Sequence, residues 1–379
     1  MQQVKPDRCQ LPKQADPADA RHAYAHWKTT LVTGDGANGF RRVVRLDTPD
    51  GIANSTVSEG IAYGMILSVY FDDQELFDDL FRYSLHWVDS TGLMAWYINP
   101  EGTKACPGAD SPTAATDSDE DIAFALIMAD SKWGGSGALA QRYRDYALRQ
   151  VALVKKHEIE HETGIVKPGN QWGGADLLNL SYFAPAFFEV FGRYTDDVAF
   201  WDHVIDVNYT ALFNSLNKAN GNAENGLVPA WSNAKGEPVT AFEGAPTHYQ
   251  TDSARTPFRI AQHYCWTGDP RAKAYLEKVN AFFGAQGAGK LTDEYELDGT
   301  PRPAAAPIAS SRSAVIVGCA GVAAMTDSAY HDFALEAYDL LKTLKLTARS
   351  TYYQLSWTAM SLAFMSGEYV DLTQNVKKK

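Results

Sequence analysis

No part of the chain is hydrophobic for long enough to cross a membrane, because no segment approaches the roughly 18 uninterrupted apolar residues of a spanning helix. Residues 1–17 are polar and lack the apolar segment of a signal peptide, so no secretion signal is expected within this sequence. Basic residues are also few: 34 Lys and Arg stand against 46 Asp and Glu, for a net charge of -12. Because phosphate groups bind basic surfaces, nucleic acid and anionic membranes are poor partners. A neutral ligand is the better expectation.

Cysteine is rare, with four residues in 379. Cys265 and Cys319 lie within apolar helical segments and are expected to be buried thiols. Cys9 and Cys106 lie in loop-like sequence, and a disulfide between them is a possibility that the sequence leaves open. No Gly-rich phosphate loop and no nucleophile elbow is present. We expect no cofactor and no metal.

Hydrophobic residues make up 45% of the chain, which is enough for a large buried core. Helical periodicity predicts six segments that are apolar on nearly all sides, at about 58–71, 117–131, 181–194, 252–266, 311–327 and 352–366. Six amphipathic helices alternate with them, near 17–31, 73–88, 137–157, 198–219, 269–285 and 328–345. Six inner and six outer helices predict an all-α fold, a closed (α/α)6 barrel.

The connecting segments refine this prediction. No Pro/Ser-rich linker divides the chain, so residues 1–379 are expected to form one domain. Short runs of strand-forming residues, such as 39–44, predict small β pieces at the rim. The long loops, such as 96–116 and 221–251, all precede inner helices and should therefore gather at one end of the barrel. Long loops on a rigid scaffold often carry function.

Three acids stand at the starts of predicted inner helices: Glu59, Asp117 and Asp252. Each could simply cap its helix, since acids at helix starts complement the helix dipole. Aromatic residues lie in loops or first turns at the same end of the barrel, namely Trp96, Trp172, Tyr182, Tyr352 and Tyr353. Each ring could be core packing, but an exposed ring can also cover the apolar face of a sugar. Acids and aromatics along one groove indicate glycoside hydrolysis, which needs a protonated carboxyl and a second carboxylate.

Five segments carry a specific resemblance: 58–65 (SEGIAYGM), 115–123 (ATDSDEDIA), 172–174 (WGG), 181–186 (SYFAPA) and 252–255 (DSAR). In this order they resemble glycoside hydrolase family 8, and most closely its bacterial endoglucanases. The resemblance implies an inverting hydrolase on an (α/α)6 barrel, with Glu59 as general acid and Asp252 as general base. Asp117 would hold the sugar at the cleavage point in a distorted shape and help order the water.

The resemblance also assigns binding residues. Tyr182 and Arg255 match positions that contact the central sugar and the catalytic carboxylates, and Trp96 and Trp172 match stacking platforms. Tyr353, rather than the adjacent tyrosine, matches a residue near the cleavage point. The implied substrate is a β-1,4-glucan of cellulose or mixed-linkage type. Xylan, lichenan or chitosan on the same scaffold, or a non-catalytic glycan-binding barrel, are alternatives. We expect a secreted or periplasmic monomer.

Two chemical constraints apply to these roles. A helix start favours the ionised form of Glu59, so a general acid there needs its pKa raised, by burial or by a nearby carboxylate such as Asp117. Asp252 must ionise, and Arg255 one turn further along could keep it so. One departure from the family is Thr251, which stands where similar endoglucanases have a tyrosine before the base.

Two other motifs resemble metal sites, but the residues in and around them argue against metal binding. Residues 157–161 read HEIEH, a zinc motif when on a helix, but charged residues surround them, which predicts a solvated face at the end of an outer helix. Asp117, Asp119 and Asp121 resemble the start of a calcium loop. Ile122 and Met128 occupy the positions of its glycine and bidentate glutamate, which argues against calcium.

Overall fold

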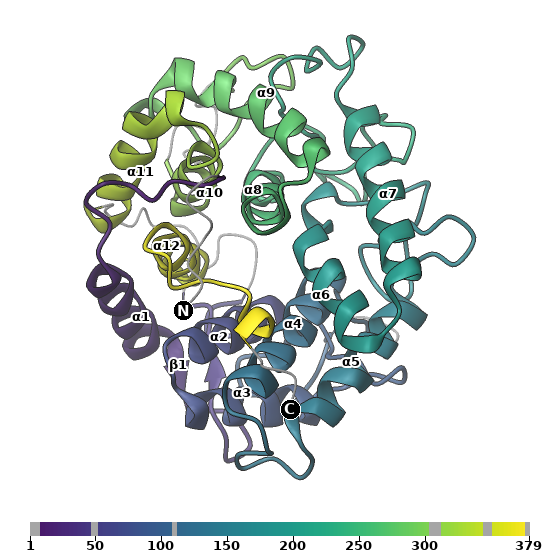
Figure 1. Ribbon diagram of the computed structural model, residues 1–379. Coiled ribbons are helices and arrows are strands. Elements are labelled where there is room, and N and C mark those ends of the chain that lie inside the picture. The colour runs from purple at the N-terminus through teal and green to yellow at the C-terminus, as the bar shows by residue number, and fades with distance from the viewer. Residues whose placement is uncertain (1–7, 47–51, 108–111, 303–311, 344–350, 376–379) are drawn as a thin grey trace.

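The computed structural model describes residues 8–46, 52–107, 112–302, 312–343 and 351–375, and within these ranges the chain forms twelve α-helices (Figure 1). The even-numbered helices are α2 (Ser58–Tyr70), α4 (Thr116–Lys132), α6 (Pro185–Thr195), α8 (Arg255–Thr267), α10 (Ala314–Ala324) and α12 (Thr351–Met365). The odd-numbered helices are α1 (Pro17–Leu31), α3 (Gln74–His86), α5 (Tyr143–His157), α7 (Val198–Ser215), α9 (Pro270–Gln286) and α11 (His331–Thr343). The helices predicted at 311–327 and 328–345 each include one or two residues that lie outside the described ranges.

The even-numbered helices form a closed inner ring. Each contacts the next in chain order, from α2 to α4 and on to α12, and α12 returns to contact α2. Every odd-numbered helix packs on the outside, with α1 against α12 and α3, α5, α7, α9 and α11 against the inner helix that precedes each. The prediction of an all-α (α/α)6 barrel is therefore confirmed.

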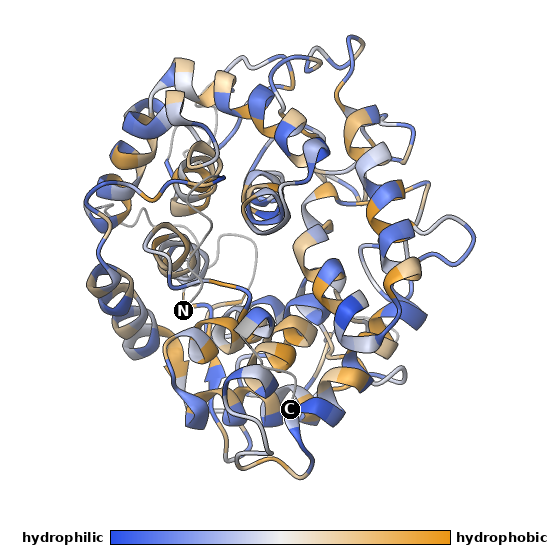
Figure 2. Ribbon diagram, viewed as in Figure 1, coloured by the Kyte–Doolittle hydropathy of each residue, from blue (hydrophilic) through white to orange (hydrophobic). Residues whose placement is uncertain are grey.

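Hydropathy explains which helices lie inside. Every residue of α10 is buried, and its small residues allow neighbouring helices to approach closely. A Cβ atom on Gly321 of α10 would lie 2.7 Å from the Cβ of Ala337 on α11, which is too close for any side chain. The outer helices alternate hydrophobic and hydrophilic residues along their length, as Figure 2 shows. An apolar stripe is all that an outer helix needs, because one side of it faces solvent.

The connections between helices differ in length at the two ends of the barrel. Inner helices lead to outer helices through short turns, such as 71–73, 196–197 and 268–269, whereas outer helices lead to inner ones through long loops, such as 87–115 and 216–254. The N-terminal ends of the inner helices and the long loops therefore share one end of the barrel, as expected.

Two small antiparallel sheets lie in these loops. Strand β1 (Val32–Thr33) pairs with β2 (Arg42–Val43), and β3 (Thr56–Val57) pairs with β4 (Tyr97–Ile98). The predicted β piece at 39–44 is confirmed by β2.

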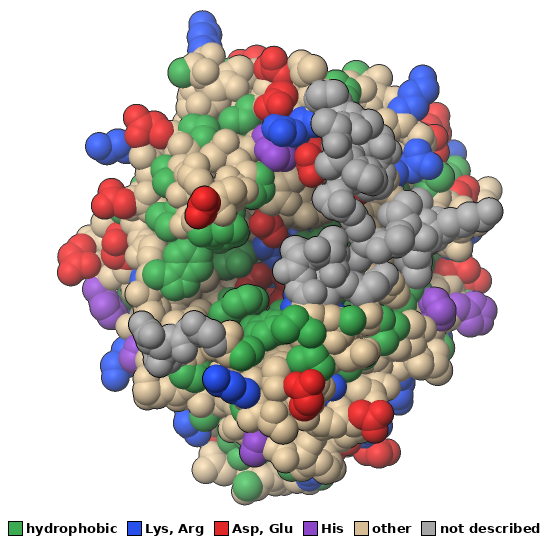
Figure 3. All heavy atoms as spheres, turned by 180° about the vertical axis from the view of Figure 1, so that it is seen from behind, with side chains coloured by type: hydrophobic (Ala, Val, Ile, Leu, Met, Phe, Trp, Pro, Cys, Tyr) green, Lys and Arg blue, Asp and Glu red, His purple; other side chains and the backbone are tan. Residues whose placement is uncertain are grey.

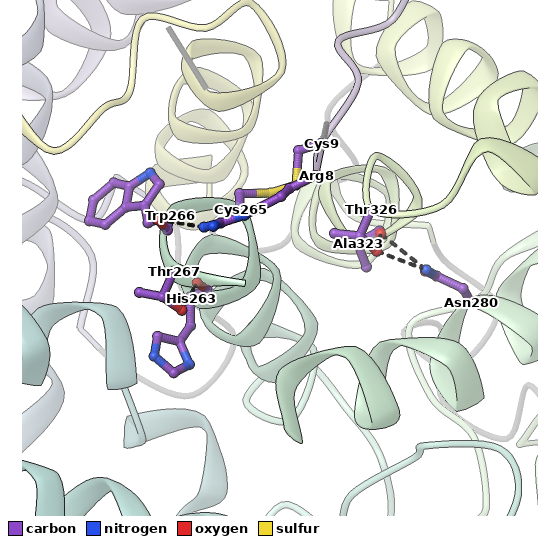
Figure 4. The surroundings of a disulfide bond; sticks show 9 residues. All are labelled: Arg8, Cys9, His263, Cys265, Trp266, Thr267, Asn280, Ala323 and Thr326. Carbon is purple, nitrogen blue, oxygen red and sulfur yellow. Dashed lines mark hydrogen bonds between the residues drawn. A yellow bond between two sulfur atoms is a disulfide. The ribbon is translucent and has the colours of Figure 1, made fainter. Parts of the chain in front are cut away.

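A disulfide joins Cys9 to Cys265 near the C-terminal end of α8, with 5.4 Å between the Cα atoms (Figure 4). Cys265 is buried, as predicted, but the prediction that it is a thiol is wrong. The bond between Cys9 and Cys106, which the sequence left open, is excluded. Cys106 lies in the rim loop after β4, whereas the segment that contains Cys9 runs beneath the other end of the barrel. There the Gln10 N–H donates to the Met325 carbonyl at 2.9 Å. Cys106 and Cys319 are free and buried.

In the part of the chain that the structure describes, none of the helices combines the length and the apolar character needed to span a membrane.

Candidate active site

Glu59 is the second residue of α2, and a sheet fixes its place. The chain leaves β3 at Val57, which pairs with Tyr97 of β4, and the Ser58 N–H then donates to the Trp96 carbonyl at 2.9 Å. Since α2 is surrounded by other helices, only its first turn can present a polar group at the end of the barrel. The Glu59 side chain is 17% exposed, so it reaches this end from a largely buried position.

Asp117 takes the equivalent place on the neighbouring inner helix. It is the second residue of α4 and is buried, with 4% of its surface exposed. The Ser58 hydroxyl donates to the Ser118 hydroxyl at 2.7 Å, which ties the first turns of α2 and α4 together. The two carboxyl groups therefore face the same space from adjacent helices.

Arg255, the first residue of α8, joins the three predicted acids. Its Nη1 donates to Glu59 Oε2 at 2.6 Å and to Asp117 Oδ2 at 2.7 Å, and its Nη2 lies 3.7 Å from Asp252 Oδ1. The guanidinium is 1% exposed, and a buried charge of this kind is stable only when it is paired. The Ser181 hydroxyl, which the sequence interpretation did not single out, accepts from Arg255 Nε at 3.1 Å.

Asp252 lies in a turn and not in the helix, which begins three residues later than predicted. The reason is local: the Gln250 side-chain carbonyl accepts the Asp252 N–H at 3.0 Å, and this holds the chain in a turn. The Gln250 amide donates back to Asp252 Oδ2 at 2.9 Å. The Asp252 side chain is 38% exposed, so it is the most open of the three carboxylates.

The electrostatics of Glu59 favour the protonated form. The pKa of Glu59 is raised to about 8, mainly by burial and to a smaller extent by the carboxyl groups of Asp117 and Asp252, while Arg255 and the Tyr352 hydroxyl act in the opposite direction. Both causes expected from the sequence are present, and burial is the larger. A carboxyl with this pKa holds its proton at neutral pH, as a general acid must.

Two tyrosines from α12 complete this part of the site. The Tyr352 hydroxyl donates to Glu59 Oε1, whereas the Tyr353 hydroxyl donates to the Thr251 carbonyl at 3.3 Å. The sequence interpretation assigned Tyr353 and missed the contact of Tyr352 with Glu59. Tyr353 also lies against Tyr63, with 6.4 Å between ring centroids, so both tyrosines are next to the carboxylates.

The remaining predicted binding residues are aromatic and lie around this centre. The Arg255 guanidinium stands over the Tyr182 ring, 5.1 Å from its centroid. Trp96 is 44% exposed and Trp172 is 38% exposed, which is unusual for such large apolar side chains. Figure 3, which views the barrel from behind, shows a hollow where acidic and basic side chains lie between hydrophobic ones.

The segment 157–161 differs from its prediction. Glu158 is fully buried, because the chain reverses after α5 and the Lys167 N–H donates to the Glu158 carbonyl at 2.8 Å. The expectation of a solvated face is therefore wrong for this residue. Burial, together with the nearby Asp119 carboxyl, raises the pKa of Glu158 well above its usual value. Among the described residues no three His, Cys, Asp or Glu side chains are grouped so that they could hold a metal ion.

Comparisons with known proteins agree with this geometry. The family model for glycosyl hydrolases family 8 matches residues 11–367. Endoglucanase A of Acetivibrio thermocellus is 37% identical over 345 residues, which cover 90% of this chain and 68% of that protein. Endoglucanase C of Ruminiclostridium cellulolyticum is 36% identical over 363 residues, or 95% of this chain and 73% of that protein.

Solved structures share the whole barrel. The apo structure of a β-1,3-1,4-glucanase from Paenibacillus sp. X4 matches with a TM-score of 0.82 and 25% identity, and the match covers 96% of each chain. A family 8 xylobiose complex from Teredinibacter turnerae matches with a TM-score of 0.79 and 22% identity over 97% of this chain and 99% of that one, which supports the fold alone. The family match spans nearly the whole chain and includes the carboxylate centre, which consists of Glu59, Asp117, Asp252 and Arg255. The chain therefore belongs to glycosyl hydrolase family 8.

Proposed function

We propose that this chain is an inverting endo-β-1,4-glucanase that acts on cellulose-type or mixed-linkage β-glucan. The observation that carries the proposal is the buried Arg255, which contacts Glu59, Asp117 and Asp252 at the end of the barrel where the long loops gather. Relatives of 36–37% identity that are named endoglucanases support the substrate class.

Glu59 is the proton donor in this mechanism. With its pKa raised to about 8 by burial, it enters the reaction protonated and transfers the proton to the glycosidic oxygen of the leaving sugar. The Tyr352 hydroxyl and Arg255 Nη1 then both contact the carboxylate that remains, on different oxygens. The negative charge left by the transfer therefore meets two hydrogen-bond donors that are already in place.

Asp252 is the base that activates water. Its exposure of 38% gives water access to the carboxylate, while Gln250 and Arg255 orient it. The water attacks the anomeric carbon on the face opposite the leaving oxygen, and the configuration is inverted. Asp117 is buried beside Arg255, where it contacts the sugar at the cleavage point and holds the ring in a distorted shape.

The stereochemistry of the products depends on the distance between the two acids. Glu59 and Asp252 contact different nitrogens of the same guanidinium, and in the proposed mechanism a water stands between Asp252 and the anomeric carbon. Inverting pairs stand roughly 6.5 to 9.5 Å apart and retaining pairs about 5 to 5.5 Å. Proton NMR of freshly cleaved cellohexaose should therefore show the α-anomer first, and early β-anomer would contradict the roles given to both acids.

Binding of a long chain would use the exposed rings. Trp96 and Trp172 are partly open to solvent, and each can stack on the apolar face of a sugar away from the scissile bond. Tyr182, Tyr353 and Arg255 would contact the central sugar, because they lie around the carboxylates.

Other members of the family act on other polymers. The reducing-end xylose-releasing exo-oligoxylanase of Paenibacillus barcinonensis is 27% identical over 66% of this chain, which keeps xylan as the second candidate substrate. The net charge of -12 would favour the cationic polymer chitosan over a neutral glucan only through long-range attraction. A panel of carboxymethylcellulose, lichenan, xylan and chitosan, assayed for reducing ends, separates these substrates and also excludes or reveals a non-catalytic barrel.

We also propose that the protein is a secreted or periplasmic monomer. The disulfide between Cys9 and Cys265 supports an oxidising compartment, since cytosolic disulfides are rare.

The role of Glu59 is tested by Glu59→Gln, which keeps the volume of the side chain but cannot deliver a proton. Activity on an unactivated glucan should fall by about 10² to 10⁴. Glu75→Gln, at a side chain that is 88% exposed on α3, serves as the matched control and should remain fully active. If Glu59→Gln folds and turns over normally, Glu59 is not the acid. If Asp252→Asn stays active while Asp117→Asn does not, the roles of these two aspartates must be exchanged.

A further inference from the structure

Phe242 is a large apolar side chain held in solvent. It is 60% exposed, more than either Trp96 or Trp172. A single exposed ring is ordinary on a protein surface and needs no function. What distinguishes Phe242 is its connection to the carboxylate centre through other rings.

That connection passes through Trp231, which precedes Phe242 in the same long loop between α7 and α8. Trp231 is only 6% exposed, and three rings surround it: Trp172 at 5.7 Å, Tyr182 at 6.5 Å and Phe242 at 6.2 Å between centroids. Tyr182 in turn lies under the Arg255 guanidinium. An unbroken series of aromatic contacts therefore leads from the carboxylate centre outward to Phe242.

The backbone around Phe242 is defined by hydrogen bonds. The Ala245 N–H donates to the Phe242 carbonyl at 2.9 Å and closes a tight turn, in which Gly244 supplies the positive φ of +78° at the third position. The Val239 N–H donates to the Trp231 carbonyl at 3.0 Å. Ala245 and Trp231 belong to the same small buried cluster, separate from the barrel core. The ring is therefore presented from an anchored turn.

We infer that Phe242 is an outer sugar-binding platform of the cleft, beyond Trp172, and that Trp231 is the positioning residue that holds both rings. This inference rests on the proposed function and extends it, because it says how far the binding cleft reaches. The ligand class is a β-linked hexopyranose chain, whose rings have apolar faces that stack on aromatic side chains.

The surroundings favour a sugar over a protein partner. The large exposed side chains of this surface are Phe242 and the partly exposed Trp172, and they are supported by a ring that is almost fully covered. A stable protein interface buries about 800 Å² on each partner and has a broad apolar centre. Two separated rings with a buried support suit successive sugars of a chain better than a folded surface.

The test compares substrates of increasing length. For Phe242→Ala, kcat/KM on the longest soluble cello-oligosaccharides should fall about 5- to 10-fold, the lower part of the range for a stacked ring, while kcat/KM on the shortest cleaved oligosaccharide stays unchanged. Phe242→Tyr keeps a flat ring and should restore the activity on long substrates. Val198→Ala, at a side chain 46% exposed at the start of α7, is the control for loss of exposed apolar surface and should act as wild type at every length.

Trp231 is tested through its coupling to Phe242. In Trp231→Ala both platforms lose their support, so KM for long substrates should rise. Adding Phe242→Ala to this variant should have almost no further effect. Because Phe242 is exposed, its variants fold and can decide the question even if Trp231→Ala does not. An equal loss at all lengths, or no loss at any length, in Phe242→Ala would overturn the inference. A wild-type protein without activity on any β-1,4-glucan would instead overturn the proposed function.

Discussion

The disulfide between Cys9 and Cys265 should be a major contributor to the stability of this barrel. The two cysteines are 256 residues apart, so the bond restricts the unfolded chain over two thirds of its length. The chain-entropy relation gives about 5.5 kcal/mol for a loop of this size. With an unfolding entropy typical of 379 residues, this free energy corresponds to about 7 °C in the midpoint of thermal unfolding, Tm.

The perturbation is the double variant Cys9→Ala/Cys265→Ala, which leaves no unpaired partner. Its Tm, followed by circular dichroism, should fall by about 7 °C, and wild-type protein treated with a reductant should unfold at the same lower temperature. Cys106→Ala is the control, since Cys106 is also buried but free. Activity below Tm should persist, because Cys265 and Arg255 lie near opposite ends of α8. A double variant whose Tm lies within about 1 °C of that of wild type would refute the reasoning.

Two further predictions concern protons. The value of kcat/KM should fall as pH rises through the Glu59 pKa of about 8, because an ionised Glu59 cannot protonate the leaving oxygen. Rates measured between about pH 5 and about pH 10 would contradict this if kcat/KM already fell steadily from about pH 5, as it would for a glutamate of ordinary pKa. Burial also raises the pKa of Glu158, so the folded chain keeps a proton on this residue that the unfolded chain releases above about pH 4.3. The free energy of unfolding should therefore decrease as pH rises from about 4.3 toward the pKa of Glu158 in the folded chain. The free energy of unfolding, measured with urea, should therefore decrease less between about pH 5 and about pH 8 for Glu158→Gln than for wild type. Equal decreases would show that Glu158 does not titrate in this range.

The barrel could be predicted from the sequence because its signal is local. Each inner helix is a long apolar segment, and α10, which is buried along its whole length, can be recognised from its composition alone. The acids at the starts of these helices follow from the same pattern, since a buried helix has few other places for a carboxylate. Asp117 and Glu59 were found in this way at the second residue of their helices.

The features that the sequence did not reveal depend on contacts between distant residues. Cys9 and Cys265 meet only because the N-terminal segment crosses beneath the barrel, and nothing near either cysteine signals it. Glu158 has charged neighbours in sequence, yet the reversal of the chain after α5 turns it inward. Tyr352 and Tyr353 are adjacent, and only the rotation of α12 about its axis decides which hydroxyl reaches Glu59.

The pairing of β3 with β4 has a consequence for the products. Next to this sheet the Ser58 N–H donates to the Trp96 carbonyl, so the backbone of one proposed platform is bonded to the residue that directly precedes the proposed acid. A sugar stacked on Trp96 would then stand at a constant number of units from the bond that Glu59 protonates. The backbone of this small sheet would therefore fix which sugar of the bound chain stacks on Trp96, counted from the bond that is cut, however long the polymer is.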